Sequence, residues 1–301
     1  MKPVAVLPSL CTLGNAFCGV LAIAYGADAV AILSHAPVDA ASPTKVGREI
    51  LELFHLKFTW ACWLIFLANV FDALDGRLAR MTKMTSEFGA MLDSLADMIT
   101  FGVAPAFLLK FLYEATLRLE DKIVRPKLVL LMCFLYVACA AIRLARFTAE
   151  TEDDAESHDF FKGLPSPAAA MSVASGILFY NFLWDRDAPE WMAQYRGGFL
   201  TFLLGCMPAL ALLMVSRVRY VHVVNRFARG RQPYTYVVQI VLVALVLFLV
   251  KEYAIVLLSL GYAIGCPVIG LLEKLLKKEI WPRSPPRPPP AAAAAEPGET
   301  P

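Results

Sequence analysis

The sequence has few charged residues for its length. Only 18% of its 301 residues are Asp, Glu, Lys or Arg, and 58% are hydrophobic, whereas soluble domains have about 25% charged and about 45–50% apolar residues. This apolar excess is too large for a soluble core of this size, so we expect the chain to lie in a lipid bilayer. The formal net charge is only +2, which argues against nucleic-acid binding and against a disordered chain.

The sequence also lacks cysteines and histidines at the spacings of a disulfide framework, a metal site or a catalytic triad. The seven cysteines are an odd number and most stand in apolar runs, which excludes a disulfide framework and a zinc pattern. No pair of the four histidines has the spacing of a metal site or a catalytic triad. We expect all four in loops: His35, His55, His158 and His222. The chemistry should therefore depend on other side chains.

Long apolar runs divide the chain into segments that can span a membrane. A transmembrane helix needs about 20 mostly apolar residues. The runs that approach this length are Leu7–Leu33, Phe58–Leu74, Gly89–Leu112, Leu128–Ile142, Pro167–Trp184, Phe199–Val215, Tyr236–Val250 and Tyr253–Leu272. The predicted fold is an all-α integral membrane protein with about eight transmembrane helices. Six spans with a re-entrant hairpin also fit, because only Lys251 and Glu252 separate the last two runs.

The basic residues predict an orientation for these spans. With eight spans, Lys and Arg are more frequent on the side of the N-terminus, and cytoplasmic loops are enriched in these residues. Both termini and the loop Arg77–Lys83 are therefore expected in the cytoplasm. We expect residues 1–278 to form one membrane domain, and the Pro- and Ala-rich residues 279–301 to form a disordered tail.

Four aspartates stand close together in this charge-poor sequence. Asp72 and Asp75 are three residues apart, and Asp93 and Asp97 are four apart, so each pair shares one face of its helix. A short polar connection joins the two runs, which brings all four carboxylates to the same membrane face. Buried carboxylates repel one another unless cations neutralise them. Two divalent ions, Mg²⁺ or Mn²⁺, match such oxygen ligands and would clamp a phosphate group.

Small residues and arginines accompany the aspartates. Gly76, Ala79 and Gly89 share faces with them, which leaves room for a ligand or, alternatively, for helix packing. Arg143 and Arg146 are three residues apart at the inner end of a span. They can bind a carboxylate or a lipid phosphate, or they can anchor the helix among the headgroups.

The aspartates belong to a longer motif that resembles the signature of the CDP-alcohol phosphatidyltransferase family. It reads Asp75-Gly76-x2-Ala79-Arg80-x8-Gly89-x3-Asp93-x3-Asp97, with Asp72 three residues before it. Two further regions, Leu7–Asn15 and the pair Ala141–Phe147 and Phe161–Ala170, resemble bacterial phosphatidylserine synthases of the membrane-integral type. The resemblance covers about Pro3 to Leu213, so it implies a six-helix family core followed by two C-terminal spans.

This resemblance implies an activity and a set of site residues. The reaction would transfer the phosphatidyl group from CDP-diacylglycerol to the hydroxyl of L-serine, giving phosphatidylserine and CMP. The four aspartates would hold two divalent ions, with Asp97 also acting as the base, although the residues alone leave open which aspartate is the base. The nucleotide pocket would consist of Gly76, Ala79, Arg80, Gly89, Thr12 and Asn15. The expected setting is the bacterial inner membrane, with a cytoplasmic active site and a homodimeric assembly.

Two other functions remain open at this point. The same chemistry can serve another alcohol acceptor, namely glycerol 3-phosphate, inositol phosphate or choline. A divalent-cation transporter would use the aspartates as its transport site. Such sites usually lie near the bilayer midplane between repeated halves, and no repeat is apparent in this sequence.

Overall fold

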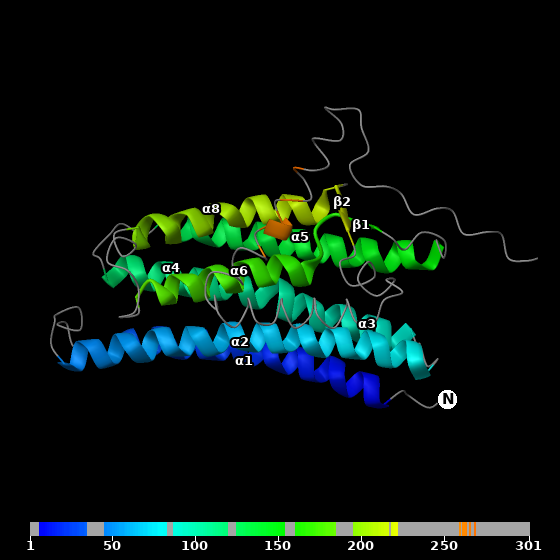
Figure 1. Ribbon diagram of the computed structural model, residues 1–301, viewed down its shortest axis with the longest axis horizontal. Helices are drawn as coiled ribbons and strands as arrows, with labels where there is room; N and C mark the ends of the chain where they lie inside the picture. Colours follow the sequence, from blue (N-terminus) through cyan, green and yellow to red (C-terminus); the bar gives the residue numbers. More distant parts are fainter. Residues whose placement is uncertain are drawn as a thin grey trace, which may run out of the picture.

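Long helices run side by side through the computed structural model and form one bundle (Figure 1). The structure describes residues 6–34, 45–82, 87–119, 125–153, 160–184, 195–216 and 218–221, and near the C-terminus 259, 261–263, 265 and 268. Within these residues, five helical stretches are long and apolar enough to cross a membrane. The predicted class, a helical integral membrane protein, is confirmed.

The first two helices form an antiparallel pair. α1 (Val6–Ser34) has 29 residues and α2 (Lys45–Thr82) has 38. At 1.5 Å per residue, both are longer than the hydrocarbon core of a bilayer, which is about 30 Å thick. Their outer sides carry large apolar groups, since Phe17 is 66% and Trp60 is 55% exposed. Such surfaces suit contact with lipid.

The third span is one continuous helix with a π-helical turn in its middle. Its three parts are α3 (Glu87–Asp97), η2 (Met98–Val103) and α4 (Ala104–Leu119). Pro105 has no N–H to offer the carbonyl of Phe101, four positions earlier. The hydroxyl of Tyr136, in α5 (Pro126–Asp153), donates a hydrogen bond to that carbonyl at 3.2 Å. A neighbouring helix thus supplies the bond that the irregular turn lacks.

The two sides of α3 differ in polarity. Phe88, Met91 and Leu95 are 62%, 68% and 64% exposed, and they lie on the side of the helix opposite Asp93. Asp97, at the end of the same helix, is only 8% exposed. The acidic side of α3 therefore faces the bundle, and its apolar side faces the surroundings.

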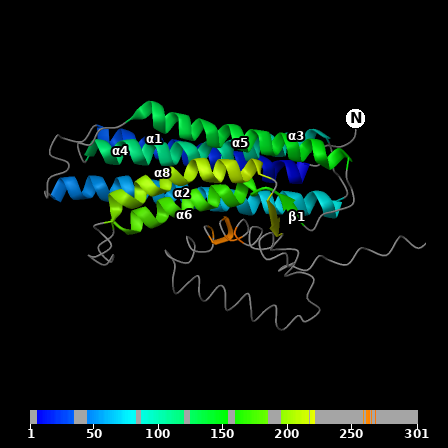
Figure 2. The ribbon, with the colours of Figure 1, turned by 90° about the horizontal axis from the view of Figure 1, so that it is seen from above.

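The structure describes two more helices of the bundle (Figure 2). They are α6 (Ser166–Phe182) and α8 (Arg196–Val215). Between α5 and α6, the short strand β1 (Phe160–Lys162) pairs antiparallel with β2 (Arg219–Val221), which follows α8. Gly163 follows β1 with a φ of +88°, a conformation that favours glycine. Its N–H donates to the carbonyl of Val218 at 2.8 Å, which ties the start of the turn before α6 to the segment that follows α8.

The predicted spans agree with the structure in part. Six of them coincide with described helices. The helix α2, however, begins at Lys45 and not at Phe58. Its first turns contain charged residues, which a helix tolerates but which interrupt an apolar run. The predicted span Tyr236–Val250 lies outside the described residues, and Tyr253–Leu272 is described only at 259, 261–263, 265 and 268. The count of eight spans, the domain boundary at 278 and the tail 279–301 therefore stay predictions.

Candidate active site

Three carboxylates meet where α2 and α3 lie close together. Asp72 and Asp75 come from α2 and Asp93 comes from α3, and one oxygen atom of each lies within 4.8 Å of the others. Helical periodicity accounts for this arrangement, because residues three apart share a face and α3 begins soon after α2 ends. The structure thus brings together three of the four predicted aspartates.

Two buried oxygen atoms near these carboxylates have no hydrogen-bond donor among the residues that the structure describes. They are Oδ1 of Asp93 and Oδ1 of Asn15. A buried acceptor without a donor costs about 1–3 kcal/mol. Hard divalent cations prefer oxygen ligands of this type, and carboxylates above all. The residues present therefore fit a divalent metal ion.

Asp97 lies outside this group of three. The amide nitrogen Nδ2 of Asn15 donates a hydrogen bond to its Oδ1 at 3.0 Å. The hydroxyl of Thr100, in η2, in turn donates to the main-chain carbonyl of Asn15 at 3.0 Å. Asp97 is therefore oriented by α1, whereas no donor to Oδ1 of Asp93 is found in the described part of the chain.

The polar residues of α1 contact aspartates rather than standing alone. Thr12, predicted for the nucleotide pocket, donates through Oγ1 to Oδ2 of Asp75 at 3.0 Å. Asn15, predicted for the same pocket, holds Asp97. Both side chains are buried, at 4% and 0% exposure. These hydrogen bonds place Thr12 and Asn15 beside the carboxylates. In the sequence, the signal for this position was that two polar residues stand three positions apart in an otherwise apolar helix.

Among the small residues of the motif that the structure describes, Gly76 borders open space. Gly76 is exposed, and a Cβ atom added there would meet nothing within 4 Å. Gly89 is half-buried, one turn before Asp93. Ala79 and Arg80 belong to α2, but their side chains lie outside the described residues. The nucleotide-binding assignments of these residues stay predictions.

The two predicted arginines have different contacts. Arg143 donates through Nη1 to the hydroxyl of Ser166, the buried first residue of α6, at 2.6 Å. Arg143 also interacts electrostatically with Asp97 and Asp72. Arg146 makes a long contact of 3.4 Å from Nη1 to the carbonyl of Val215, at the end of α8. Arg143 is therefore within electrostatic reach of the acidic residues.

Comparison with known proteins decides the family. The sequence profile of the CDP-alcohol phosphatidyltransferase family matches residues 5–205, which is more than half of the chain. The chain belongs to this family. It is therefore a transferase of phospholipid biosynthesis, as the motif suggested.

Relatives within the family bear names that specify the reaction. The CDP-diacylglycerol–serine O-phosphatidyltransferase of Helicobacter pylori J99 is 30% identical over 223 residues, which cover 73% of this chain and 73% of that protein. The enzyme of the same name from Methanocaldococcus jannaschii is 34% identical over 157 residues, 52% of this chain and 61% of that protein. The archaetidylserine synthase of Methanothermobacter thermautotrophicus is 35% identical over 166 residues, 53% and 57% of the two chains.

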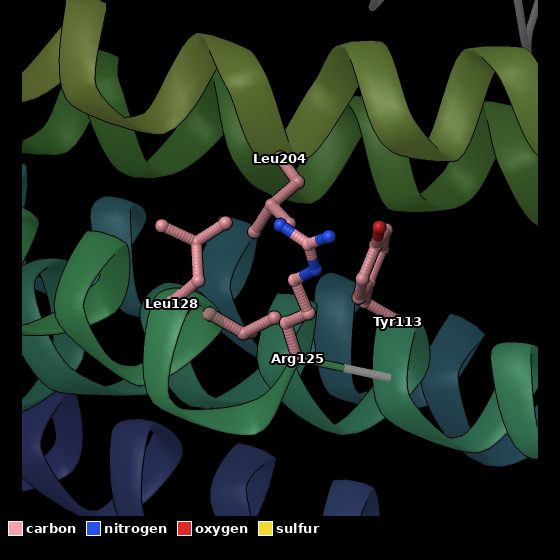
Figure 3. Close-up of a pocket in the computed structure, with 5 residues that line it drawn as sticks. Tyr113, Arg125, Leu128 and Leu204 are labelled. Carbon is pink, nitrogen blue, oxygen red and sulfur yellow. The ribbon is translucent and has the colours of Figure 1, made fainter. Parts of the chain in front are cut away.

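A separate cavity lies toward the other end of the bundle. Its volume is about 300 Å³, and it is lined by Tyr113, Arg125, Leu128, Val129 and Leu204. In Figure 3 the guanidinium group of Arg125 extends between Leu204 and Tyr113. These residues belong to the end of α4, the start of α5 and to α8, far along the helices from Asp93. The cavity is therefore not part of the acidic site.

His55 does not lie where the sequence predicted, and the other three histidines, His35, His158 and His222, lie outside the described residues. His55 is inside α2 rather than in a loop, because the charged residues around it do not interrupt the helix. Its Nδ1 lies 2.9 Å from Oδ1 of Asn181 in α6, and its ring stacks on Trp184 at 5.1 Å. The imidazole thus connects α2 with α6 at the end of the bundle remote from the aspartates.

Proposed function

We propose that this protein transfers the phosphatidyl group from CDP-diacylglycerol to the hydroxyl of L-serine, with phosphatidylserine and CMP as products. The observation that carries this proposal is the cluster of Asp72, Asp75 and Asp93, with Asp97 nearby, in a membrane-embedded member of the family. Serine as the acceptor is supported by the names of the relatives from Helicobacter pylori and Methanocaldococcus jannaschii.

The aspartates would hold the metal. We assign two divalent ions, Mg²⁺ or Mn²⁺, to Asp72, Asp75 and Asp93, with Asp97 as the fourth position of the family motif. The close approach of three carboxylates and the unpartnered Oδ1 of Asp93 support this assignment. Bound ions would neutralise the diphosphate and stabilise the charge that develops on the attacking and leaving oxygens.

Asp97 is our choice for the base. A serine hydroxyl is a poor nucleophile until a base lies within hydrogen-bond reach. Asp97 lies outside the group of three and is oriented by Asn15, so its carboxylate is the best placed to accept the hydroxyl proton. The serine oxygen then bonds to the phosphorus of the phosphatidyl group. The bond from that phosphorus to CMP breaks, and CMP leaves with the bonding electrons.

Arginine and small residues would bind the two substrates. Arg143, oriented by the hydroxyl of Ser166, would bind the serine carboxylate or a lipid phosphate through its planar guanidinium group. Arg146 shares this prediction, but its contact with Val215 also stabilises the end of α8. For the nucleotide we keep Gly76, Ala79, Arg80 and Gly89, with Thr12 and Asn15 behind the carboxylates.

The site would face the cytoplasm from the bacterial inner membrane, with both termini on the same side. The distribution of Lys and Arg supports this orientation. We also retain the homodimer, one membrane domain over residues 1–278 and a tail over 279–301 as parts of the proposal.

A CMP-release assay tests the proposed function. Purified protein in lipid nanodiscs should release CMP from CDP-diacylglycerol only when L-serine and Mg²⁺ or Mn²⁺ are both present. Asp97→Asn should lower kcat by at least about a hundredfold, the usual contribution of a general base. Asp28→Asn is the matched control, because Asp28 is exposed and pairs with Lys57 far from the site, and it should keep wild-type kcat.

Other results would replace parts of this proposal. CMP release with glycerol 3-phosphate, inositol phosphate or choline, and none with serine, would change the acceptor. Divalent-metal uptake into liposomes without any need for nucleotide would favour the transporter. Wild-type activity in Asp97→Asn would show that another group is the base.

A further inference from the structure

The cavity beside Arg125 lies near the membrane face opposite to the aspartates. Its volume is about 300 Å³. Tyr113, which lines it, follows Asp93 by 20 residues in the third span, and such a stretch of helix is about 30 Å long. The hydrocarbon core of a bilayer has about the same thickness. The cavity therefore lies at the level of the lipid headgroups in the leaflet opposite to the acidic site.

The described residues that line this cavity combine one positive charge with apolar walls. The guanidinium group of Arg125 extends between Leu204 and the phenol ring of Tyr113 (Figure 3). Leu128 and Val129 complete the lining. Within the described part of the chain, this guanidinium group makes no hydrogen bond or ion pair with another side chain. Arg125 is exposed, so an anion can reach its free N–H donors from outside the bundle.

The flanking residues add further positive charge. Arg118 is exposed in the last turn of α4, and Lys127 is exposed in the first turn of α5. The carboxylate of Glu114 is already paired, since its Oε2 lies 2.9 Å from Nζ of Lys110. Lys and Arg are enriched on the cytoplasmic side of membrane proteins, whereas these residues lie on the other side in the proposed orientation. Topology therefore does not account for them, and an anionic ligand does.

An exposed apolar stripe leads away from the cavity along α5. Leu128, Leu131 and Phe134 share one side of this helix and are 44%, 62% and 66% exposed. Leu128 also lines the cavity, so the stripe begins at its edge. Exposed apolar surface on a membrane helix suits contact with lipid. A ligand with an anionic head and acyl chains can contact both the cavity and the stripe, whereas a free phosphate ion can contact the cavity alone.

We propose that this cavity binds the phosphate group of an anionic phospholipid from the leaflet opposite to the acidic site. Arg125 donates N–H groups to the phosphate oxygens through its planar guanidinium group, and Tyr113 donates its hydroxyl to one of them. The acyl chains lie along the stripe that begins at Leu128. The cavity is lined by α4, α5 and α8, so the bound lipid stabilises the packing of these three helices. This second lipid site goes beyond the proposed function and does not rest on the reaction.

Native mass spectrometry of the full chain in detergent micelles tests this inference, with dioleoylphosphatidylglycerol as the probe. Arg125→Gln should raise the Kd of one bound lipid about tenfold or more, the effect of losing a hydrogen bond between charged groups. The matched control is Arg48→Gln, which removes the same charge. Arg48 is exposed near the start of α2, toward the same end of the bundle, and does not line the cavity. This control should keep the wild-type Kd.

Thermal unfolding without added lipid reports whether the variants fold. Arg125→Gln and Arg48→Gln should both unfold at the wild-type midpoint. If Arg125→Gln unfolds earlier, Tyr113→Phe decides the question, because it keeps the ring and removes only the hydroxyl. Its Kd for the lipid should rise about threefold, the effect of losing one hydrogen bond, and an unchanged Kd in this variant would overturn the proposal.

Other outcomes would also overturn this inference. An equal Kd in a well-folded Arg125→Gln would show that the lipid binds elsewhere, and an equal rise in Arg48→Gln would show diffuse attraction to charge. Equal binding of dioleoylphosphatidylcholine would contradict an anionic ligand. If inorganic phosphate raises the unfolding midpoint of the wild type, but not of Arg125→Gln, and the lipid does not bind, the ligand is a free anion. None of these measurements uses serine or CDP-diacylglycerol, so their failure and that of the proposed function are distinguishable.

Discussion

The aspartates differ in which of their oxygen atoms are already bonded within the protein. Asp75 accepts a hydrogen bond from Thr12 and Asp97 accepts one from Asn15, both at 3.0 Å. Oδ1 of Asp93 receives none from the residues described. The helix α1 thus orients one carboxylate of each pair, and under the proposed function these two bonds help to decide which oxygen atoms are free for metal or for a proton.

Asn15 provides a test at the scale of a single residue. Asn15→Ala removes the donor that orients Asp97, so kcat should fall about tenfold to a hundredfold, while the KM for CDP-diacylglycerol stays within about threefold. The control on the same helix is Ser34→Ala, since the exposed Ser34 hydroxyl donates to the nearby carbonyl of Ala31 at 2.8 Å. A higher KM for CDP-diacylglycerol with unchanged kcat would instead support the nucleotide role predicted for Asn15.

The acidic cluster was predictable from the sequence, but the hydrogen bonds that orient its carboxylates were not. Helical spacing acts over three or four residues, so the positions of Asp72, Asp75 and Asp93 were enough to predict their convergence. The bonds from Thr12 to Asp75 and from Asn15 to Asp97 join residues 63 and 82 positions apart. Local periodicity carries no information about such pairs, which depend on how α1 packs against α2 and α3.

At the scale of elements, α1 and η2 approach each other closely. A Cβ atom added at Gly19 would lie 2.4 Å from Oγ1 and 2.8 Å from Cα of Thr100. Because Cα belongs to the backbone, a side-chain rotation cannot relieve this overlap. The same turn carries the hydrogen bond from Thr100 to Asn15, so the close contact also determines where Asp97 lies.

Gly19→Ala should therefore destabilise the protein. The free energy of unfolding should fall by about 1–3 kcal/mol, as in other overpacked positions, and thermal unfolding in detergent micelles measures this as a lower midpoint. The control is Gly205→Ala in α8, where an added Cβ meets nothing within 4 Å. That variant should unfold at or above the wild-type midpoint, because alanine favours a helix by up to about 1 kcal/mol. Equal midpoints for Gly19→Ala and wild type would contradict the close packing.

The elements themselves were predicted unevenly. Apolar length was sufficient to locate α1, α5 and α8, because a bilayer requires that length. The predicted run Pro167–Trp184 also coincides with α6, which has 17 residues and is not one of the five stretches long and apolar enough to cross a membrane. The π-helical turn at Met98–Val103 was missed, since it depends on Pro105 and on the distant hydroxyl of Tyr136. The strands β1 and β2 were also missed, because three-residue strands that pair across a long stretch of chain have no local signature.

At the scale of the whole molecule, the bundle has two chemically different ends. The aspartates and Arg143 lie at one end, and His55, Asn181 and the cavity beside Arg125 lie toward the other. The family motif therefore lies at one end of the bundle, an arrangement that the proposed orientation requires.

Labelling of introduced cysteines tests that orientation. Arg48 and Ala90 are exposed residues near the two opposite ends. In intact cells, a membrane-impermeant maleimide should modify Arg48→Cys, whereas Ala90→Cys should react only after the inner membrane is permeabilised. The unaltered chain is the control for its native cysteines. Labelling of Ala90→Cys in intact cells would place the acidic site on the outer face.

The two-sided character of α3 has a consequence for how a lipid is processed. One side of this single helix carries Asp93, and the other presents Phe88, Met91 and Leu95 outward. The hydrocarbon of the bilayer therefore begins about one helix diameter, roughly 10 Å, from the reacting headgroup under the proposed function. A lipid substrate can keep its acyl chains in the membrane throughout the reaction and arrive by lateral diffusion. Its effective concentration is then its mole fraction in the leaflet, because the enzyme takes its substrate from the plane of the membrane.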